Sequence, residues 1–237
     1  MKKIVVLTGS GISAESGLKT FRDSGGLWEG FKVEEVASPQ GFQANPERVL
    51  EFYNQRRKQA QEALPNAGHE ALVKLEQAYE VFIVTQNVDD LHERAGSSQV
   101  LHLHGQLNKA RSVVNEDCIC EMEGDIKIGD LGEDGHQLRP HIVWFGESVP
   151  MMEEAAILSS IADIFVIIGT SLSVYPANGL VNFVSEEADI YLVDPVVPAY
   201  ALPTSVNFFQ HKASVGVPLL VEQLLKDISP ADTSPQS

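Results

Sequence analysis

The sequence predicts an α/β fold in which a doubly wound parallel sheet carries a small inserted lobe. Six short β-branched runs are almost continuously apolar, which is typical of strands buried on both faces of a parallel sheet. Helical patterns separate most of these runs. Two segments, residues 22–65 and 109–139, break the alternation and are the expected insertions.

The expected strands cover residues 4–8, 81–85, 100–103, 142–145, 164–168 and 190–193. Helices are expected at residues 46–64, after Asn66, at 152–161 and at 218–228, and Asn66 is a good N-cap for an apolar face that includes Ala71, Leu72, Leu75 and Tyr79. We therefore expect a single Rossmann-like domain over residues 1–228. Its core would comprise about 1–21, 66–108 and 140–228, its small lobe 22–65 and 109–139, and residues 229–237 would form a disordered polar tail.

Composition limits the classes of function. Lys and Arg number 17 against 33 Asp and Glu, so the formal charge of −16 disfavours binding to nucleic acid. No stretch approaches the roughly 20 apolar residues that span a bilayer, and the apolar run near the N-terminus is too short for a signal peptide. We expect a cytoplasmic protein with no direct membrane partner.

The first strand leads into a glycine-rich loop, GSGISAESG at residues 9–17. Glycines there let the backbone approach a pyrophosphate, and the N-terminus of a following helix would attract its charge. Ala14 stands where a third glycine would complete the dinucleotide fingerprint, so an ordinary strand–turn–helix remains an alternative. Asp194 follows the last strand and could hold a ribose hydroxyl, or be a turn residue before Pro195.

Further blocks follow in order: TQNVDDLH at residues 85–92, LHG at 103–105, LRP at 138–140, VWFGE at 143–147 and GTS at 169–171. Together with the glycine-rich loop, they resemble the sirtuin family from about residue 4 to residue 226, and most closely its bacterial desuccinylase-like class. The resemblance implies an enzyme that consumes NAD to remove acyl groups from protein lysines. Its products would be free lysine, nicotinamide and O-acyl-ADP-ribose.

The resemblance also assigns residues. His104 would be the general base, a role that suits a group whose pKa is near neutral, whereas His102 is left as a strand residue. Asn87 and Asp89 would hold the nicotinamide ribose and carboxamide, although on their own they could be a helix-capping pair. The implied NAD contacts are Gly9, Ser10, Gly11, Ile12, Ser13, Glu15, Phe21, Arg22, Gln86, Asn87, Asp89, Gly169, Thr170, Ser171, Asp194 and Ala213.

The expected helix at 46–64 carries the candidate acyl selector. Tyr53 and Arg56 are three residues apart and so share a helix face. In desuccinylase-like sirtuins such a pair binds the distal carboxylate of succinyl, malonyl or glutaryl lysine, and Gly26 fits the wide pocket of that class. Arg57 and Lys58 are read as solvated or locally paired. Peptide contacts would come from Val143, Phe145, Gly146, Glu147, Val174 and Tyr175, with the acyl-lysine peptide added as an extended strand.

The cysteines depart from the family pattern. Most sirtuins hold structural zinc with two Cys-x-x-Cys pairs, but this chain has only Cys118 and Cys120, with Ser112 near the place of a first ligand. His136 could add a ligand, yet no fourth thiolate exists. We expect no metal site and a small lobe held by its own packing.

Three other functions are alternatives. Mono-ADP-ribosyl transfer or plain NAD hydrolysis could use the same scaffold. A non-enzymatic NAD or ADP-ribose sensor would be expected to lack His104, Asn87 or Asp89, and all are present. A dehydrogenase would need a fuller glycine fingerprint and a site for a hydride acceptor.

Overall fold

The computed structural model describes residues 1–19, 27, 28, 30–200, 202 and 205–227. Phe21, Arg22, Gly26 and the tail at 229–237 lie outside these described residues. None of the described helices is long and apolar enough to cross a membrane.

A six-stranded sheet forms the larger part of the molecule, and every pair of neighbouring strands in it is parallel. Its order is β11-β10-β9-β1-β4-β5. The strands are β1 (Lys3–Thr8), β4 (Glu80–Thr85), β5 (Val100–His102), β9 (Ile164–Ile168), β10 (Asp189–Val193) and β11 (Asn207–Phe209). Because the order reverses direction at β1, the crevice between the ends of β1 and β9 is where such folds bind nucleotides. The α/β expectation is confirmed.

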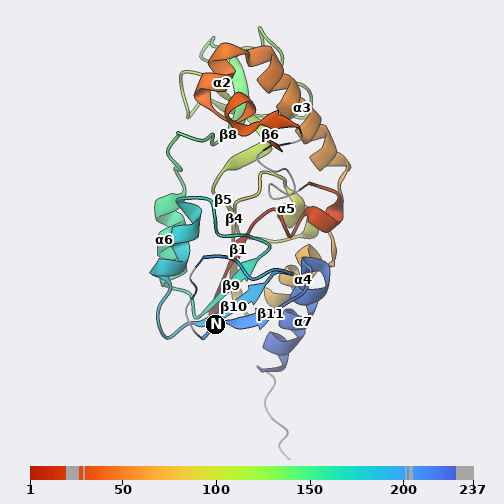
Figure 1. Ribbon diagram of the computed structural model, residues 1–237, viewed down its shortest axis with the longest axis vertical. Helices are drawn as coiled ribbons and strands as arrows, with labels where there is room; N and C mark the ends of the chain where they lie inside the picture. The colour runs from red at the N-terminus through yellow and green to blue at the C-terminus, as the bar shows by residue number, and fades with distance from the viewer. Residues whose placement is uncertain (20–26, 29, 201, 203–204, 228–237) are drawn as a thin grey trace, which may run out of the picture.

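Helices cover both faces of this sheet (Figure 1). α4 (Ala67–Leu75) and α7 (Ala213–Lys226) pack on the face formed by Ile4 and Val6, while α6 (Met152–Ser160) and η3 (Ala177–Phe183) cover the face formed by Val5 and Leu7. Alternate residues of one strand thus enter different cores, which explains why the run is apolar throughout.

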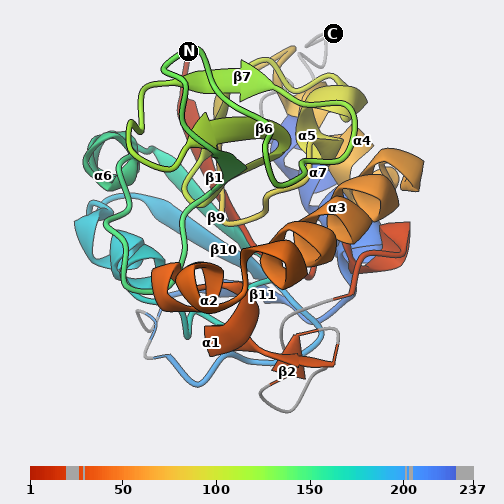
Figure 2. The same ribbon diagram turned by 90° about the horizontal axis from the view of Figure 1, so that it is seen from above.

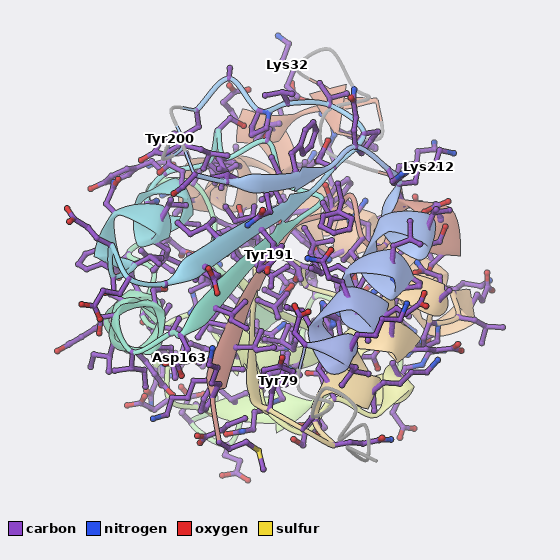
Figure 3. The ribbon with its side chains drawn as sticks, turned by 90° about the horizontal axis from the view of Figure 1, so that it is seen from below. Lys32, Tyr79, Asp163, Tyr191, Tyr200 and Lys212 are labelled. Atoms are coloured by element: carbon purple, nitrogen blue, oxygen red, sulfur yellow. The ribbon has the colours of Figure 1, made fainter. Side chains whose placement is uncertain are left out.

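Asn66 caps α4 as expected, and the helix at 46–64 is confirmed as α3 (Pro46–Glu62), with Asn45 as its N-cap. The expected start at 218 is wrong, because α7 begins at Ala213 and contains Pro218. Tyr79, labelled in Figure 3, lies on the α7 side of the sheet. The Tyr79 hydroxyl donates to the Leu224 carbonyl at 2.8 Å.

A small three-stranded antiparallel sheet lies beyond the carboxyl ends of the large sheet (Figures 1 and 2). Its order is β7-β6-β8, with β6 (Gly105–Ser112), β7 (Ile119–Glu121) and β8 (Leu138–Ile142). The described remainder includes α3 and the short elements η1 (Ala14–Ser16), β2 (Leu27–Trp28), β3 (Phe31–Lys32), α1 (Val33–Val36), α2 (Pro39–Ala44) and α5 (Leu91–Ala95).

The strand expected at residues 142–145 is wrong. β8 ends at Ile142 and pairs with β6, and the chain then turns at Gly146, where φ is +93°. The apolar run continues past the strand because Trp144 is buried between α3 and β8, where it needs no sheet partner.

Side-chain bonds from α3 anchor the small sheet. Asn54 donates to the Ile126 carbonyl at 2.9 Å and accepts from the Ile126 amide at 2.9 Å. Arg57 donates to the Leu107 carbonyl at 2.6 Å and to the Asn54 side chain at 2.8 Å. Arg57 is 2% exposed, so of its two expected states the solvated one is wrong and the locally paired one is confirmed: it donates to the Asn54 side chain in the same helix, and to the Leu107 and Gly124 carbonyls outside it.

Candidate active site

A cavity of about 550 Å³ lies between the large sheet and the small sheet. Its lining comes from the ends of β1, β4 and β9, from α3 and from the loops around residues 143–149 and 171–176. The predicted site residues that line it are Gly9, Ser10, Tyr53, Arg56, Gln86, Asn87, Asp89, His104, Val143, Phe145, Gly146, Glu147, Gly169, Thr170, Ser171, Val174 and Tyr175. Residues from distant parts of the chain therefore meet where the strand order reverses.

Two glycine-rich segments form the floor of this cavity. The Gly9 amide donates to the Ile168 carbonyl at 3.0 Å, and the Gly11 amide donates to the Gly169 carbonyl at 2.8 Å. A Cβ on Gly11 would lie 2.6 Å from the Gly169 Cα, and Gly169 itself has φ of +60°. These glycines are therefore required for the close approach of the two segments, in addition to any ligand.

A helix is expected after this loop, and among the described residues it is only the single turn η1, Ala14–Ser16. An anion here would be bound by backbone amides and side chains, and the dipole of a long helix contributes nothing.

Several predicted NAD contacts lie away from the cavity lining: Gly11, Ile12, Ser13, Glu15, Asp194 and Ala213. Glu15 accepts a 3.0 Å bond from the Ser214 amide in the first turn of α7. The Asp194 carboxylate accepts a bond from the Val196 amide at 2.9 Å, which fits the turn-residue alternative to a ribose contact.

Ser13 holds the side chains of two predicted site residues, Asn87 and Asp89. Its hydroxyl accepts a 3.2 Å bond from the Asn87 side chain, and both residues are buried. Asp89 is 7% exposed, and burial raises its pKa, while bonds from the Leu91 amide and the Ser13 hydroxyl oppose that shift. Gln86 donates to the Thr170 hydroxyl at 3.0 Å and so joins the ends of β4 and β9.

His104 is arranged as a proton acceptor. Its Nδ1 lies 3.0 Å from the Gln86 carbonyl, which can only accept, so Nδ1 carries the proton and Nε2 holds a lone pair. Burial lowers the pKa of His104, and the bond to Gln86 partly opposes this effect. The imidazole is therefore neutral near pH 7 and can take up a proton at Nε2.

His102 has a role that sequence reasoning missed. Its Nδ1 lies 3.0 Å from the Asn87 carbonyl, and its Nε2 lies 2.7 Å from a Glu93 carboxylate oxygen. β5 ends at His102 and His104 lies just beyond it, and the two imidazoles hold the successive carbonyls of Asn87 and Gln86. The repeated His-x-His spacing was the signal available in the sequence.

The acyl-selector pair lies on the cavity side of α3. Arg56 is half-buried, and its guanidinium carbon lies 5.8 Å from the centre of the Phe52 ring. Tyr53 is fully buried and accepts a 3.0 Å bond from the Trp144 indole nitrogen. Because no part of Tyr53 is exposed, a ligand reaches the phenol only after the neighbouring side chains shift.

Glu147 faces inward from the substrate rim. It accepts bonds from Arg139 at 2.6 and 3.1 Å, from Arg111 at 3.2 Å and from the Trp144 amide at 2.8 Å. Its carboxylate therefore orders the loop that presents Phe145 and Gly146, which are exposed.

The cysteines lie at the far end of the small sheet. Cys118 is half-buried and Cys120 is exposed. Within the described part of the chain, no group of three or more His, Cys, Asp or Glu residues is placed to hold a metal ion.

Comparison with known proteins gives the family. The model of the Sir2 family matches residues 9–176, which is well over half of the chain. The chain belongs to the Sir2 family. This finding confirms the sirtuin resemblance that the sequence blocks indicated.

Curated Sir2-type relatives are similar over nearly the whole chain. A protein of Helicobacter pylori named NAD-dependent protein deacylase is 51% identical over 226 residues, which cover 95% of this chain and 97% of that protein. One of Bacteroides thetaiotaomicron with the same name is 52% identical and covers 95% of this chain and 99% of that protein. A solved Sir2 homologue in complex with NAD has a TM-score of 0.86 at 38% identity, covering 96% of this chain and 91% of that chain.

Proposed function

We propose that this chain is an NAD-dependent protein lysine deacylase that removes acidic acyl groups, succinyl and malonyl in particular, and also accepts acetyl. The deacylase part is supported by relatives of that name at about half identity over almost the full length. The acyl preference rests on one observation: Tyr53 and Arg56 line the same cavity as His104.

His104 would act as the general base. Its lone pair at Nε2 would accept the proton of the ribose hydroxyl that attacks the activated acyl carbon, while Nδ1 stays bonded to the Gln86 carbonyl. Positioned proton transfer of this type contributes roughly 10² to 10⁴ in rate.

NAD would occupy the floor of the cavity as a co-substrate. The solved homologue in complex with NAD supports this placement, as do the polar groups gathered at the switch point of the sheet. When bound, NAD supplies the ribosyl carbon that receives the acyl oxygen as nicotinamide leaves. Ser10, Thr170 and Ser171 would hold the phosphates and the adenosine ribose, and Asn87 with Asp89 would orient the nicotinamide half.

Gly11, Ile12, Ser13, Glu15 and Asp194 would act in this proposal through the loops that they order. Ala213, the first residue of α7, remains a proposed contact. Phe21 and Arg22, outside the described residues, remain proposed contacts to the nicotinamide half.

The distal carboxylate of a succinyl group would pair with Arg56. A guanidinium donates two parallel hydrogen bonds to a carboxylate, and such charge-assisted bonds are about twice as strong as neutral ones. The acetyl group ends in a methyl and gains nothing from this pair, so Arg56 discriminates between the two acyl groups.

The protein substrate would dock as an extended strand across the rim. Phe145 and Tyr175 are 49% and 85% exposed, and with Val143, Gly146 and Val174 they flank the cavity mouth. Backbone bonds from an added strand give affinity with little demand on sequence. Acylated lysines in many proteins are therefore the expected partners.

The test compares succinyl-lysine and acetyl-lysine peptides of one sequence, with NAD, for the wild type, Arg56→Met and Lys58→Met. Lys58 is exposed on the same helix and is the matched control. Loss of one charged pair should lower kcat/KM for the succinyl peptide by roughly 10- to 100-fold in Arg56→Met, and Lys58→Met should behave as the wild type. Equal effects of Arg56→Met on both peptides would contradict the acyl preference. Release of nicotinamide without deacylation of either peptide would instead favour NAD hydrolysis or ADP-ribosyl transfer.

A further inference from the structure

We propose that Trp144 is a positioning residue for acyl selection, because its indole N–H directs the Tyr53 hydroxyl to donate its proton toward the acyl group. This inference rests on the proposed function, since it assigns a role within the same acyl site.

The direction of the hydrogen bond between Trp144 and Tyr53 determines where the phenol proton points. Trp144 Nε1 lies 3.0 Å from the Tyr53 hydroxyl oxygen. An indole nitrogen can only donate, so the phenol oxygen is the acceptor in this bond. The phenol has one proton, and that proton is directed away from Trp144. A carboxylate has only acceptor atoms, so a phenol with this orientation matches it.

The indole is held so that it cannot turn away from Tyr53. Trp144 is 2% exposed, and its backbone amide donates to Glu147 at 2.8 Å. The guanidinium carbon of Arg139 lies 3.3 Å from the centre of the indole ring, and the Phe42 ring lies 5.3 Å from it. A side chain fixed by packing and by a second layer of bonds keeps its donor in one direction.

Arg139 is itself fixed by Glu147, which accepts two of its bonds at 2.6 and 3.1 Å. The side chains of both are well buried, with 8% of Arg139 and 17% of Glu147 exposed. A continuous chain of contacts therefore joins Glu147 to Arg139, Trp144 and Tyr53. The loop that presents Phe145 to the peptide thereby also orders the acyl pocket.

The environment keeps Tyr53 in the form that can donate. Burial is the largest influence on this phenol and raises its pKa, although the bond from Trp144 and the nearby arginines act in the other direction. The hydroxyl therefore keeps its proton at any pH at which the enzyme works.

A double-mutant cycle tests the inference. The readout is the ratio of kcat/KM for succinyl-lysine to that for acetyl-lysine peptide, in the wild type, Trp144→Phe, Tyr53→Phe and the double variant. Losing one hydrogen bond to a charged group should lower the ratio about 10-fold in each single variant. The double variant should show no further fall, because Trp144 acts only through the phenol.

A matched control separates hydrogen bonding from packing. Phe42→Leu alters a ring that packs on Trp144 and leaves the indole N–H in place, so the ratio should stay within about 2-fold of the wild type. An unchanged ratio in Trp144→Phe, or losses that add in the double variant, overturns the inference. If Arg56→Met still lowers the ratio, the proposed function survives that failure, and if Arg56→Met also has no effect, both fail.

A second measurement does not require Trp144→Phe to fold. The chain has two tryptophans, so ¹⁵N-labelled indole groups give two resonances, which Trp28→Phe assigns. The Trp144 indole resonance should move upfield in Tyr53→Phe as its acceptor is lost. If it stays at the wild-type position, the bond is absent and the inference is overturned.

Discussion

Replacing Arg57 should destabilise the fold, whereas replacing its neighbour Arg56 should change substrate choice. The Arg57 guanidinium is buried and donates two bonds that join α3 to β6 and to the loop before Ile126, and a third to Asn54 within α3. In Arg57→Met the apolar stem is kept, but the Leu107 carbonyl and the Asn54 side-chain oxygen each lose a charged donor.

The expected cost follows from these contacts. A hydrogen bond to a charged group contributes about 1.5–3 kcal/mol, so the loss of the two bonds to Leu107 and Asn54 costs about 3–6 kcal/mol. Burial lowers the pKa of Arg57, which means that burying this charge costs the folded state free energy. Because Arg57→Met removes that cost, the lower end of the range applies. About 3 kcal/mol in a domain of this length corresponds to a fall in Tm of roughly 6–12 °C.

Thermal unfolding followed by circular dichroism measures this shift for the wild type, Arg57→Met and Lys58→Met. The exposed Lys58 should give a Tm close to that of the wild type, since such surface changes stay within about 0.5 kcal/mol. A Tm for Arg57→Met within about 2 °C of the wild type would refute the claim that this residue anchors the small sheet.

Two further predictions concern histidines. His104→Ala should lower kcat for either peptide at least about 100-fold. Because burial lowers the pKa of His104, the acidic limb of the wild-type kcat/KM profile should have its midpoint below the usual histidine pKa of about 6.5. A midpoint above that value would argue against His104 as the base. Burial lowers the pKa of His69 to about 4, so the unfolded chain binds a proton below about pH 6.5 that the folded chain does not. The His69 contribution to stability is then complete above that pH and is lost as the pH falls toward 4. Urea unfolding at pH 7 and 5 should therefore show a loss that is about 2 kcal/mol smaller in His69→Gln than in the wild type. An equal loss in His69→Gln would exclude this residue as the cause.

Most of the large sheet could be predicted from the sequence because β1, β4, β9 and β10 are largely buried on both faces, whereas the exposed β11 gave no signal. Continuous apolar runs such as the one at Val5 and Leu7 are a strong signal, and five of the six expected strands are present. β6 gave no such signal, since Gln106, Asn108 and Lys109 interrupt any apolar run. One of its partners, β8, is distant in sequence, and the other, β7, is only three residues long and exposed, so neither is marked by a local apolar pattern.

The candidate site could be predicted mainly through ordered sequence blocks, whereas contacts between distant elements could not. Arg57 is expected to be solvated or locally paired because arginine is usually exposed, and besides its local bond to Asn54 it reaches carbonyls of other elements. Glu147 lines the cavity, as a peptide contact would, but its bonds to Arg111 and Arg139 also tie it to two strands of the small sheet. The Trp144–Tyr53 bond joins residues 91 apart in the sequence, which no spacing rule could reveal.

The most direct test of the central claim is a competition in one reaction. Wild-type protein, NAD and equal concentrations of succinyl-lysine and acetyl-lysine peptides of one sequence would be followed by mass spectrometry. The account predicts that free-lysine peptide, nicotinamide and O-succinyl-ADP-ribose appear first, with the acetyl product later. Consumption of the acetyl peptide alone would contradict the role of Tyr53 and Arg56 and leave a plain deacetylase.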